Sequence, residues 1–478
     1  MEPAQREATA ATRDGAVLVS RTREVPDVSY RAFLSSQPTP RVHWAAPDGL
    51  EIAGSGAAVR LTASGADRFD ELRRAANAVF ESVDRAGPTE TRPRLLGGMA
   101  FNENHEPTGP WEGFPAAAFT LPRVQLTRAD GTTWLTVREY GPDSSAERVE
   151  ADLDDLEADL SSLPKMCPSG GPPGVVSTRV TPSKAVWTDQ VERAIERIEA
   201  GDLRKVVLAT ALGVDLGAEV DVLATLERLR RTYPNCYRFL VQPTDDGAFF
   251  GPTPERLVRM DGRTVRTEAL AGSVPRGGTP EADADYAESL VESEKLQHEQ
   301  QLVTDAIRQQ LAPLGRVEAG EQGVRKLTNI QHLETPITAD LDADGHVLDI
   351  VEALHPTPAV GGLPPDRAWD VIRETETFER GWYAAPVGWF DGAGDGEFAV
   401  GIRSGVAGGR SATLFAGNGI VADSDPEEEW EEVQPKYRPI LDELENGGDD
   451  GHGTDGVGEG DRRPDGTDGS DRRTNGAE

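Results

Sequence analysis

The chain has 478 residues, enough for one large α/β domain or two packed lobes around a sizeable core. Its formal net charge is −34, from 49 basic and 83 acidic residues, which argues against a protein that holds nucleic acid on a basic face. No apolar run is as long as a membrane span and no signal peptide is recognisable, so we expect a cytoplasmic protein without a membrane partner.

Lysine and cysteine are both rare. The two cysteines cannot build a disulfide framework or a closed thiolate zinc site. An acidic surface with so few lysines suits a salt-rich cytoplasm, and we expect a halophilic archaeal source. Because arginine cannot accept a proton as a base, each lysine kept here is a candidate for a function that needs an amine. The lysines are Lys165, Lys184, Lys205, Lys295, Lys326 and Lys436.

The first third of the chain is predicted to be rich in strands. Residues 1–27 form a polar N-terminal segment. Short apolar runs then alternate with Gly/Pro turns through residues 28–163, with one helical pattern at Asp67–Val83, which indicates a sheet-rich N-terminal lobe. A stretch dense in Pro, Gly and Ser follows, and we place a linker at residues 164–180.

The pattern becomes clearer in residues 181–445, which we interpret as a second domain. An amphipathic helix ends at Gly201, and an apolar strand follows at Leu203–Leu212. Helix and strand then alternate, so the fold class is predicted to be α+β, an α/β sandwich of large, mostly antiparallel sheets flanked by helices. Residues 446–478 are acidic and rich in Gly and Asp, and are predicted to be a disordered tail.

Two segments carry candidate acid and base groups. Lys205 is predicted to share a strand face with Val207 and Ala209, where an amine is desolvated and becomes a usable base; a lysine that reaches solvent is the alternative. Glu255 precedes a strand that reverses at Asp261–Gly262. Its apolar neighbours suit a general acid, although an exposed turn glutamate gives the same pattern.

Carboxylates on two helices are candidate metal ligands. Glu299 falls on the apolar stripe of its helix, where a carboxylate needs a partner and a metal ion is a candidate. A second helix is predicted to begin at Asp425, with Glu429 and Glu432 beside its packed stripe; a solvated acidic face is the alternative. A carboxylate from this helix that met Glu299 would complete the oxygen-rich shell that Mg²⁺ prefers.

One arginine and several glycines indicate a receptor for a carboxylate. Arg403 is predicted to lie on a strand at Ala399–Ser404, and glycines interrupt two other apolar segments at Gly272 and Gly417. Glycine lets backbone amides come close to a ligand, and arginine binds carboxylates with two parallel hydrogen bonds.

Taken in order, these segments resemble the chorismate-utilising enzymes, and most closely the isochorismate synthase branch of that family. The resemblance covers Trp187 to Leu444. The matching segments are Lys205–Ala209, Gly251–Leu257, Leu270–Ser273, Ser293–Glu299, His332–Pro336, His355–Ala359, Ile402–Arg403, Phe415–Val421 and Glu429–Lys436.

The resemblance implies a large α/β sandwich with a deep central site, and a reaction that adds water to C2 of chorismate while the C4 hydroxyl leaves. Lys205 would activate the water and Glu255 would protonate the leaving group. Glu299, Glu429 and Glu432 would hold Mg²⁺. The implied substrate-binding residues are Ala271, Gly272, Ser273, His332, Thr357, Ala359, Arg403, Gly417 and Lys436.

The resemblance also implies a small-molecule enzyme with chorismate as substrate, no obligatory glutamine amidotransferase, a monomeric state, and a product that starts menaquinone synthesis. Within the family, anthranilate synthases typically have glutamine where this chain has Lys205, and aminodeoxychorismate synthases have a nucleophilic lysine in place of Ala271. Salicylate synthases lack the run at His355–Ala359. Val360, where many isochorismate synthases have leucine, is a departure near the substrate.

The alternatives are a salicylate synthase, component I of an anthranilate synthase, or a non-catalytic acidic protein that binds a ligand or ion. A non-catalytic protein of this kind is expected to lack Lys205 or Glu255, and both residues are present.

Overall fold

The computed structural model describes residues 15–163, 170–326 and 330–445, without the side chains of Ser161 and Ser273. The predicted tail at 446–478, residues 1–14 and part of the predicted linker therefore lie outside the described residues. Within them, residues 17–25 of the predicted polar segment form strand β1, and residues 175–180 of the predicted linker belong to strand β8.

The strands run the whole length of the described chain. They are β1 (Val17–Val25), β2 (Arg41–Ala45), β3 (Glu51–Ala63), β4 (Val83–Ala86), β5 (Arg94–Met99), β6 (Ala117–Ala129), β7 (Thr132–Gly141), β8 (Val175–Thr181), β9 (Lys205–Leu216), β10 (Tyr237–Thr244), β11 (Gly247–Thr253), β12 (Arg256–Asp261), β13 (Thr264–Pro275), β14 (Gly315–Ala319), β15 (Gly323–Lys326), β16 (Ile330–Leu341), β17 (Gly362–Leu363), β18 (Pro386–Asp391), β19 (Gly396–Val400), β20 (Gly405–Gly408) and β21 (Ser411–Ile420).

The helices lie between these strands. They are α1 (Tyr30–Ser36), α2 (Arg68–Phe80), α3 (Ala146–Ser162), α4 (Lys184–Glu199), α5 (Val222–Thr232), α6 (Pro280–Glu292), α7 (Glu294–Leu311), α8 (Val347–Leu354), α9 (Pro365–Thr375), α10 (Pro426–Val433) and α11 (Arg438–Leu444), with the 3₁₀ turns η1 (Thr89–Thr91), η2 (Gly109–Trp111) and η3 (Gln434–Tyr437).

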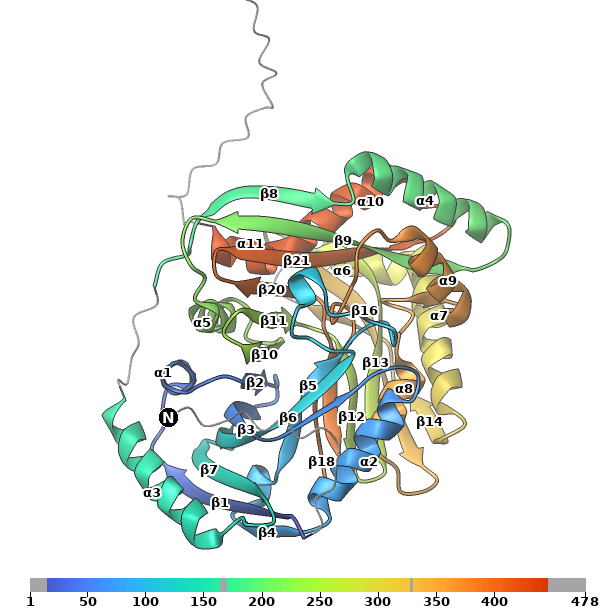
Figure 1. The fold of residues 1–478 in the computed structure, drawn as a ribbon. Coiled ribbons are helices and arrows are strands. Elements are labelled where there is room, and N and C mark those ends of the chain that lie inside the picture. The colour runs from blue at the N-terminus through green and yellow to red at the C-terminus, as the bar shows by residue number, and fades with distance from the viewer. Residues whose placement is uncertain (1–14, 164–169, 327–329, 446–478) are drawn as a thin grey trace, which may run out of the picture. The chain divides into compact units, whose positions relative to one another are not determined.

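The strands form two hydrogen-bonded runs that meet at β6 (Figure 1). One run is β1–β7–β6–β3–β2–β10–β11–β20–β21–β9–β8. The other is β5–β18–β19–β12–β13–β16, with β14 and β15 on the far side of β16. Among the described strands, only β1 and β4 pair in parallel. The largely antiparallel α+β architecture confirms the predicted fold class.

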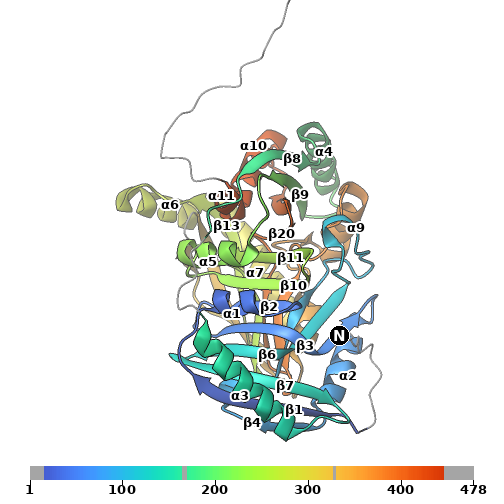
Figure 2. The ribbon, with the colours of Figure 1, turned by 60° about the vertical axis from the view of Figure 1, so that its left-hand side comes forward.

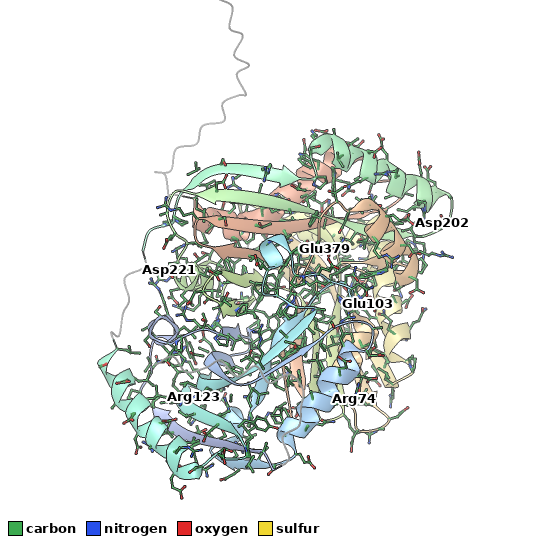
Figure 3. The ribbon with its side chains drawn as sticks, in the orientation of Figure 1. Arg74, Glu103, Arg123, Asp202, Asp221 and Glu379 are labelled. Carbon is green, nitrogen blue, oxygen red and sulfur yellow. The ribbon has the colours of Figure 1, made fainter. Side chains whose placement is uncertain are left out.

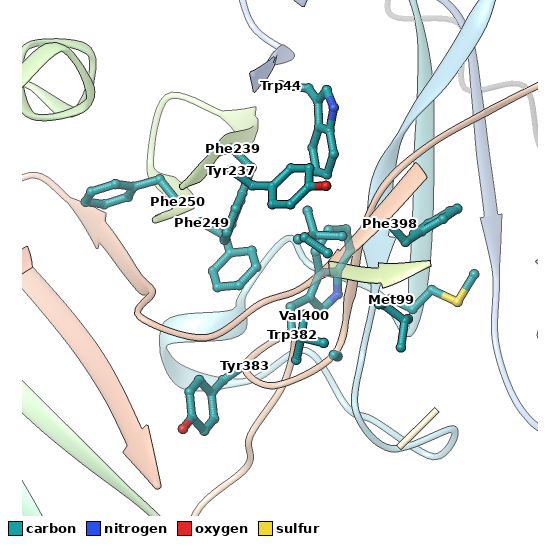
Figure 4. Packing of buried hydrophobic residues seen from close by; sticks show 14 of the residues in the cluster. Trp44, Met99, Tyr237, Phe239, Phe249, Phe250, Trp382, Tyr383, Phe398 and Val400 are labelled. Atoms are coloured by element: carbon teal, nitrogen blue, oxygen red, sulfur yellow. The ribbon is translucent and has the colours of Figure 1, made fainter. Parts of the chain in front are cut away.

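The core lies between the two runs and is rich in aromatic side chains (Figure 4). Trp382 of the loop before β18 meets Phe114 and Phe249 edge to face, with ring centroids 5.4 and 6.2 Å apart. Aromatic pairs in this geometry add to the stabilisation that comes from burying their area.

Helices cover the sheets on their outer faces. Helix α3 lies across β1 and β7, as Figure 2 shows, and α7 packs on β13 and β16. The sequence patterns did not predict α1 or α3, although Ser145 caps α3 through a hydrogen bond from Arg148. In the part of the chain that the structure describes, no helix is long and apolar enough to cross a membrane.

Strand pairing crosses the boundary predicted between the N-terminal lobe and the second domain. β2 pairs with β10, and β5 pairs with β18. The described part of the chain up to Glu445 belongs to one compact unit, in which the division at residues 164–180 stays a prediction.

Acidic side chains are frequent at the surface. Figure 3 shows the side chains, with Asp202 and Asp221 labelled among the exposed ones. Many form ion pairs with arginine, as Asp221 does with Arg31 at 2.8 Å.

Candidate active site

Lys205 is the first residue of β9 and is almost fully buried. Its Nζ donates a hydrogen bond to Glu299 Oε1 of α7 at 2.6 Å. The side chain crosses Gly419 of the neighbouring strand β21, where a Cβ atom would stand 2.6 Å from Lys205 Cε. The structure therefore places this amine inside the protein with a carboxylate partner, which favours the predicted functional lysine over one that reaches solvent.

The absence of a side chain at Gly419 positions the amine. We expect Gly419→Ala to leave the fold intact, because the far end of a lysine side chain can move aside, and to lower turnover about 10- to 10²-fold, because a catalytic group displaced by about an ångström loses much of its effect. Steady-state kinetics and thermal melting would measure both effects. Gly213→Ala on β9, the strand of Lys205, is the control, since its Cβ would meet only Arg179 O at 3.6 Å. Equal loss in both variants would contradict this role.

Glu255 lies in the short connection between β11 and β12 and is 9% exposed. Its backbone O accepts a hydrogen bond from Val400 N at 3.0 Å, which ties it to β19. Burial, followed by the charge of Glu268, raises the pKa of the Glu255 carboxyl to about 7, against the opposing charges of Arg403, Arg325 and Lys205. A carboxyl with this pKa holds its proton at near-neutral pH and can act as a general acid.

Arg403 and Lys436 are two cationic residues beside one cavity. They line a cavity of about 440 Å³ together with Glu432. Lys436 of η3 donates to Glu432 Oε1 at 3.0 Å, to Gly417 O at 3.1 Å and to Asn418 Oδ1. Arg403 follows β19 with φ +52°, a left-handed conformation that is costly for a residue with a side chain. Two cations beside one cavity can bind an anionic ligand in a protein that is otherwise strongly acidic.

The segment with Gly272 forms a bulge in β13. The register against β16 shifts between Ala271 and Ser273, and Gly272 has φ +63°, which glycine adopts without strain. His332 Nδ1 lies 2.9 Å from Gly272 O. Burial lowers the pKa of His332 to about 4, so its ring is neutral near pH 7 and fixes the bulge rather than carrying charge. The Ser273 side chain lies outside the described atoms.

The loop that contains Thr357 and Ala359 runs along β9. Gly361 O accepts from Val207 N at 2.8 Å, which brings the loop to the strand of Lys205. His355 is held by Phe101 O at 3.2 Å, and burial lowers its pKa to about 3. Thr357 is 7% exposed, and its Oγ1 is buried without a hydrogen-bond partner among the described residues. An unpaired buried hydroxyl is a site where a bound ligand can make a hydrogen bond.

The three candidate metal ligands have polar partners within the protein. Glu299 accepts from Lys205, Glu432 from Lys436, and Glu429 Oε2 from Asn418 Nδ2. Burial and the nearby charge of Glu432 raise the pKa of Glu429, whereas Lys436, acting against burial, lowers the pKa of Glu432. Among the residues described, no three acidic, histidine or cysteine side chains gather closely enough to form a metal cluster. Glu299 thus has the side-chain nitrogen of Lys205 as a neighbour, which the sequence did not reveal.

Sequence reasoning missed further polar residues around the site. Tyr383 stacks on Phe415 of β21, and its hydroxyl would stand 3.1 Å from a Cβ at Gly417. Glu268 of β13 and Arg325 of β15 pair at 2.5 Å across β16, the strand that lies between them. An acidic residue in an apolar strand was a signal for Glu268, whereas Tyr383 and Arg325 lie in segments without a strong pattern.

The chain is similar to known proteins over most of its length. A profile of the family described as chorismate binding enzyme matches residues 4–445. The isochorismate synthase MenF of Bacillus subtilis is 33% identical over 90% of this chain and 94% of its own. A salicylate biosynthesis isochorismate synthase of Pseudomonas aeruginosa is 34% identical over 85% of each chain.

Two solved structures are also similar to this chain over most of its length. The menaquinone-specific isochorismate synthase MenF of Escherichia coli superimposes with a TM-score of 0.77 at 29% identity, covering 90% of this chain and 96% of its own. Anthranilate synthase component I of Streptococcus pneumoniae has a TM-score of 0.71 at 20% identity, covering 83% and 93%, and shares the fold.

Proposed function

The chain belongs to the chorismate-binding enzyme family, and from this premise we propose that it is an isochorismate synthase, an isomerase that converts chorismate to isochorismate. The observation that carries the proposal is the pair of buried groups, Lys205 on β9 and Glu255 just before β12, which are close enough for the charge of Lys205 to lower the pKa of Glu255. A base and an acid in one water-poor site are what a displacement of hydroxide by water requires. The names of the relatives support the same reaction.

The reaction exchanges one water for another. Lys205 Nζ takes a proton from water as its oxygen bonds to C2 of the ring. The ring double bonds shift, and the bond from C4 to its hydroxyl oxygen breaks. Glu255 supplies a proton to that oxygen, which leaves as water. One water enters and one departs, so the product is an isomer of the substrate.

The dianionic substrate would be bound by Arg403 and Lys436, which line the cavity, and by residues of neighbouring segments. Arg403, Lys436 and the backbone at Gly417 would receive the enolpyruvyl carboxylate, with the Tyr383 hydroxyl beside them. The bulge at Gly272 and Ser273 would cradle the ring carboxylate, and Ala271 and His332 would shape that wall. Thr357 and Ala359 would border the ring on the side of β9.

Magnesium is part of the proposal. Glu429 and Glu432 fit a divalent cation, because burial and the charge of Glu432 raise the pKa of Glu429, and a cation beside the two carboxylates would relieve this repulsion. Glu299 would join them by giving up its bond to Lys205. When bound, Mg²⁺ would neutralise the ring carboxylate and the acidic side chains around it.

We further propose that the protein acts in the cytoplasm as a monomer, without a glutamine amidotransferase, and that its product enters menaquinone synthesis. A source in a salt-rich habitat would account for the net charge of −34.

The products formed from chorismate test the proposal. The purified protein would be incubated with chorismate and MgCl₂ at high salt, with and without ammonium, and the products identified by NMR. We expect an equilibrium mixture of chorismate and isochorismate, unchanged by ammonium. Anthranilate that depends on ammonium, or salicylate with pyruvate as the main products at neutral pH, would contradict it, and no turnover at all would favour a binding protein.

A further inference from the structure

Glu255 is in contact with a second acidic residue through its own backbone. The N–H of the peptide between Glu255 and Arg256 donates to Glu268 Oε1 at 3.3 Å. The Glu268 side chain is 7% exposed. It comes from β13, which lies beside β12 in the sheet, so the contact joins the connection that carries Glu255 to a paired strand.

Glu268 is itself held by an arginine. Arg325 of β15 donates from Nη1 to Glu268 Oε1 at 2.5 Å, and the same nitrogen lies 3.5 Å from Glu334 Oε1 of β16. The Arg325 side chain is 20% exposed, so this pair is partly shielded from water. A charge pair in such a place acts on its neighbours more strongly than one at the surface.

Charged and titratable groups face Glu255 from every element packed around it. Lys205 comes from β9, Arg403 follows β19, and Tyr383 precedes β18. Glu268 and Arg325 come from β13 and β15 and have opposite effects: Glu268 raises the pKa of Glu255, and Arg325 lowers it. Glu268 is the strongest of these charges, after burial itself.

We propose that Glu268 and Arg325 are positioning residues for the general acid of the reaction. Glu268 holds the Glu255–Arg256 peptide in place through its hydrogen bond, and its negative charge adds to the effect of burial in favouring the protonated form of the Glu255 carboxyl. Arg325 holds Glu268 and limits this effect. The inference rests on the proposed function for the role of Glu255, but the interaction between the three side chains can be measured without turnover.

Two variants that each remove one charge, one of them isosteric, separate this proposal from a purely structural role. Glu268→Gln keeps an oxygen that accepts from Arg256 N but removes the charge, so we expect Glu255 to titrate about one pH unit lower. Arg325→Gln removes the opposing cation, so we expect Glu255 to titrate at higher pH. The titration would be followed by the infrared band of the protonated carboxyl, assigned by its loss in Glu255→Gln.

The pH dependence of kcat/KM gives the functional readout. The pH at which kcat/KM falls on the alkaline side should be lower in Glu268→Gln and higher in Arg325→Gln. At low pH, the kcat of Glu268→Gln should be near that of the parent. Glu268→Ala should lower kcat at low pH without raising KM, because the peptide is no longer held. Glu318→Gln, which removes an exposed partner of Arg316 on β14, is the control for a general loss of one charge.

Shifts of opposite sign in the infrared titration would support the proposal, and shifts of the same sign or none in both variants would overturn it. A protein that forms no isochorismate but shows the opposite shifts would refute the proposed function and leave the Glu268–Arg325 pair intact.

Discussion

Lys205→Ala should lower the turnover of chorismate by about 10²-fold or more while the protein remains folded. The reason is that water is a weak nucleophile and attacks C2 only if a base removes its proton. Among the described lysines, Lys205 is buried and reaches Glu299, whereas Lys184 pairs at the surface with Glu427. Single-turnover kinetics would measure the chemical step, and equilibrium binding of chorismate should change little.

Two comparison variants show whether Lys205 acts by accepting a proton or only through its positive charge. Lys205→Arg keeps a cation near Glu299 but cannot accept a proton, so it should be as inactive as the alanine variant. Lys184→Ala removes an exposed lysine and should keep full activity. Near-normal turnover in either Lys205 variant would show that another group activates the water.

Glu255→Gln should cause a loss of similar size, because the amide has the shape of the acid but no acidic proton. The parent enzyme should lose activity as the pH rises through about 7, since the carboxyl must be protonated to act and its pKa is about 7. This alkaline limb should vanish from the residual activity of Glu255→Gln. A limb unchanged in that variant would assign it to a different group.

The sequence was informative where a single element determines the structure. Alternation of apolar residues predicted β9 and placed Lys205 on it, and the turn at Asp261–Gly262 predicted the hairpin of β12 and β13. The capping pattern at Asp425 predicted the start of α10, where Asp425 accepts from Glu427 N and Glu428 N. Each of these signals is local, and short-range sterics and hydrogen bonds suffice to explain it.

Pairings between distant segments could not be predicted in the same way. Lys205 and Glu299 are 94 residues apart, and Glu268 and Arg325 are 57 apart. Their contacts depend on which strands become neighbours, which is decided by the packing of the whole core. Glu299 was therefore assigned a metal partner, because nothing nearby in its own helix could neutralise it, and the structure shows that Lys205 supplies a charge from another strand.

Glu299→Gln and Glu432→Gln should abolish turnover that depends on Mg²⁺ and weaken binding of a divalent ion by at least about tenfold, since even indirect supports of a metal site cost that much. Activity alone cannot decide the matter, because Glu299→Gln also removes the partner of Lys205. Binding of Mn²⁺ as a paramagnetic probe, measured by electron paramagnetic resonance, reports on the ion directly.

Glu431→Gln is the matched control, because this residue is on the same helix as Glu432 and is exposed. It should bind Mn²⁺ and turn over chorismate like the parent. If Glu299→Gln bound Mn²⁺ normally but were inactive, Glu299 would serve the reaction through Lys205 and would not be a metal ligand. Full activity of the parent protein in excess chelator would show that the reaction does not need magnesium. Lys205, Arg403 and Lys436 would then have to neutralise the charges of both carboxylates of the substrate.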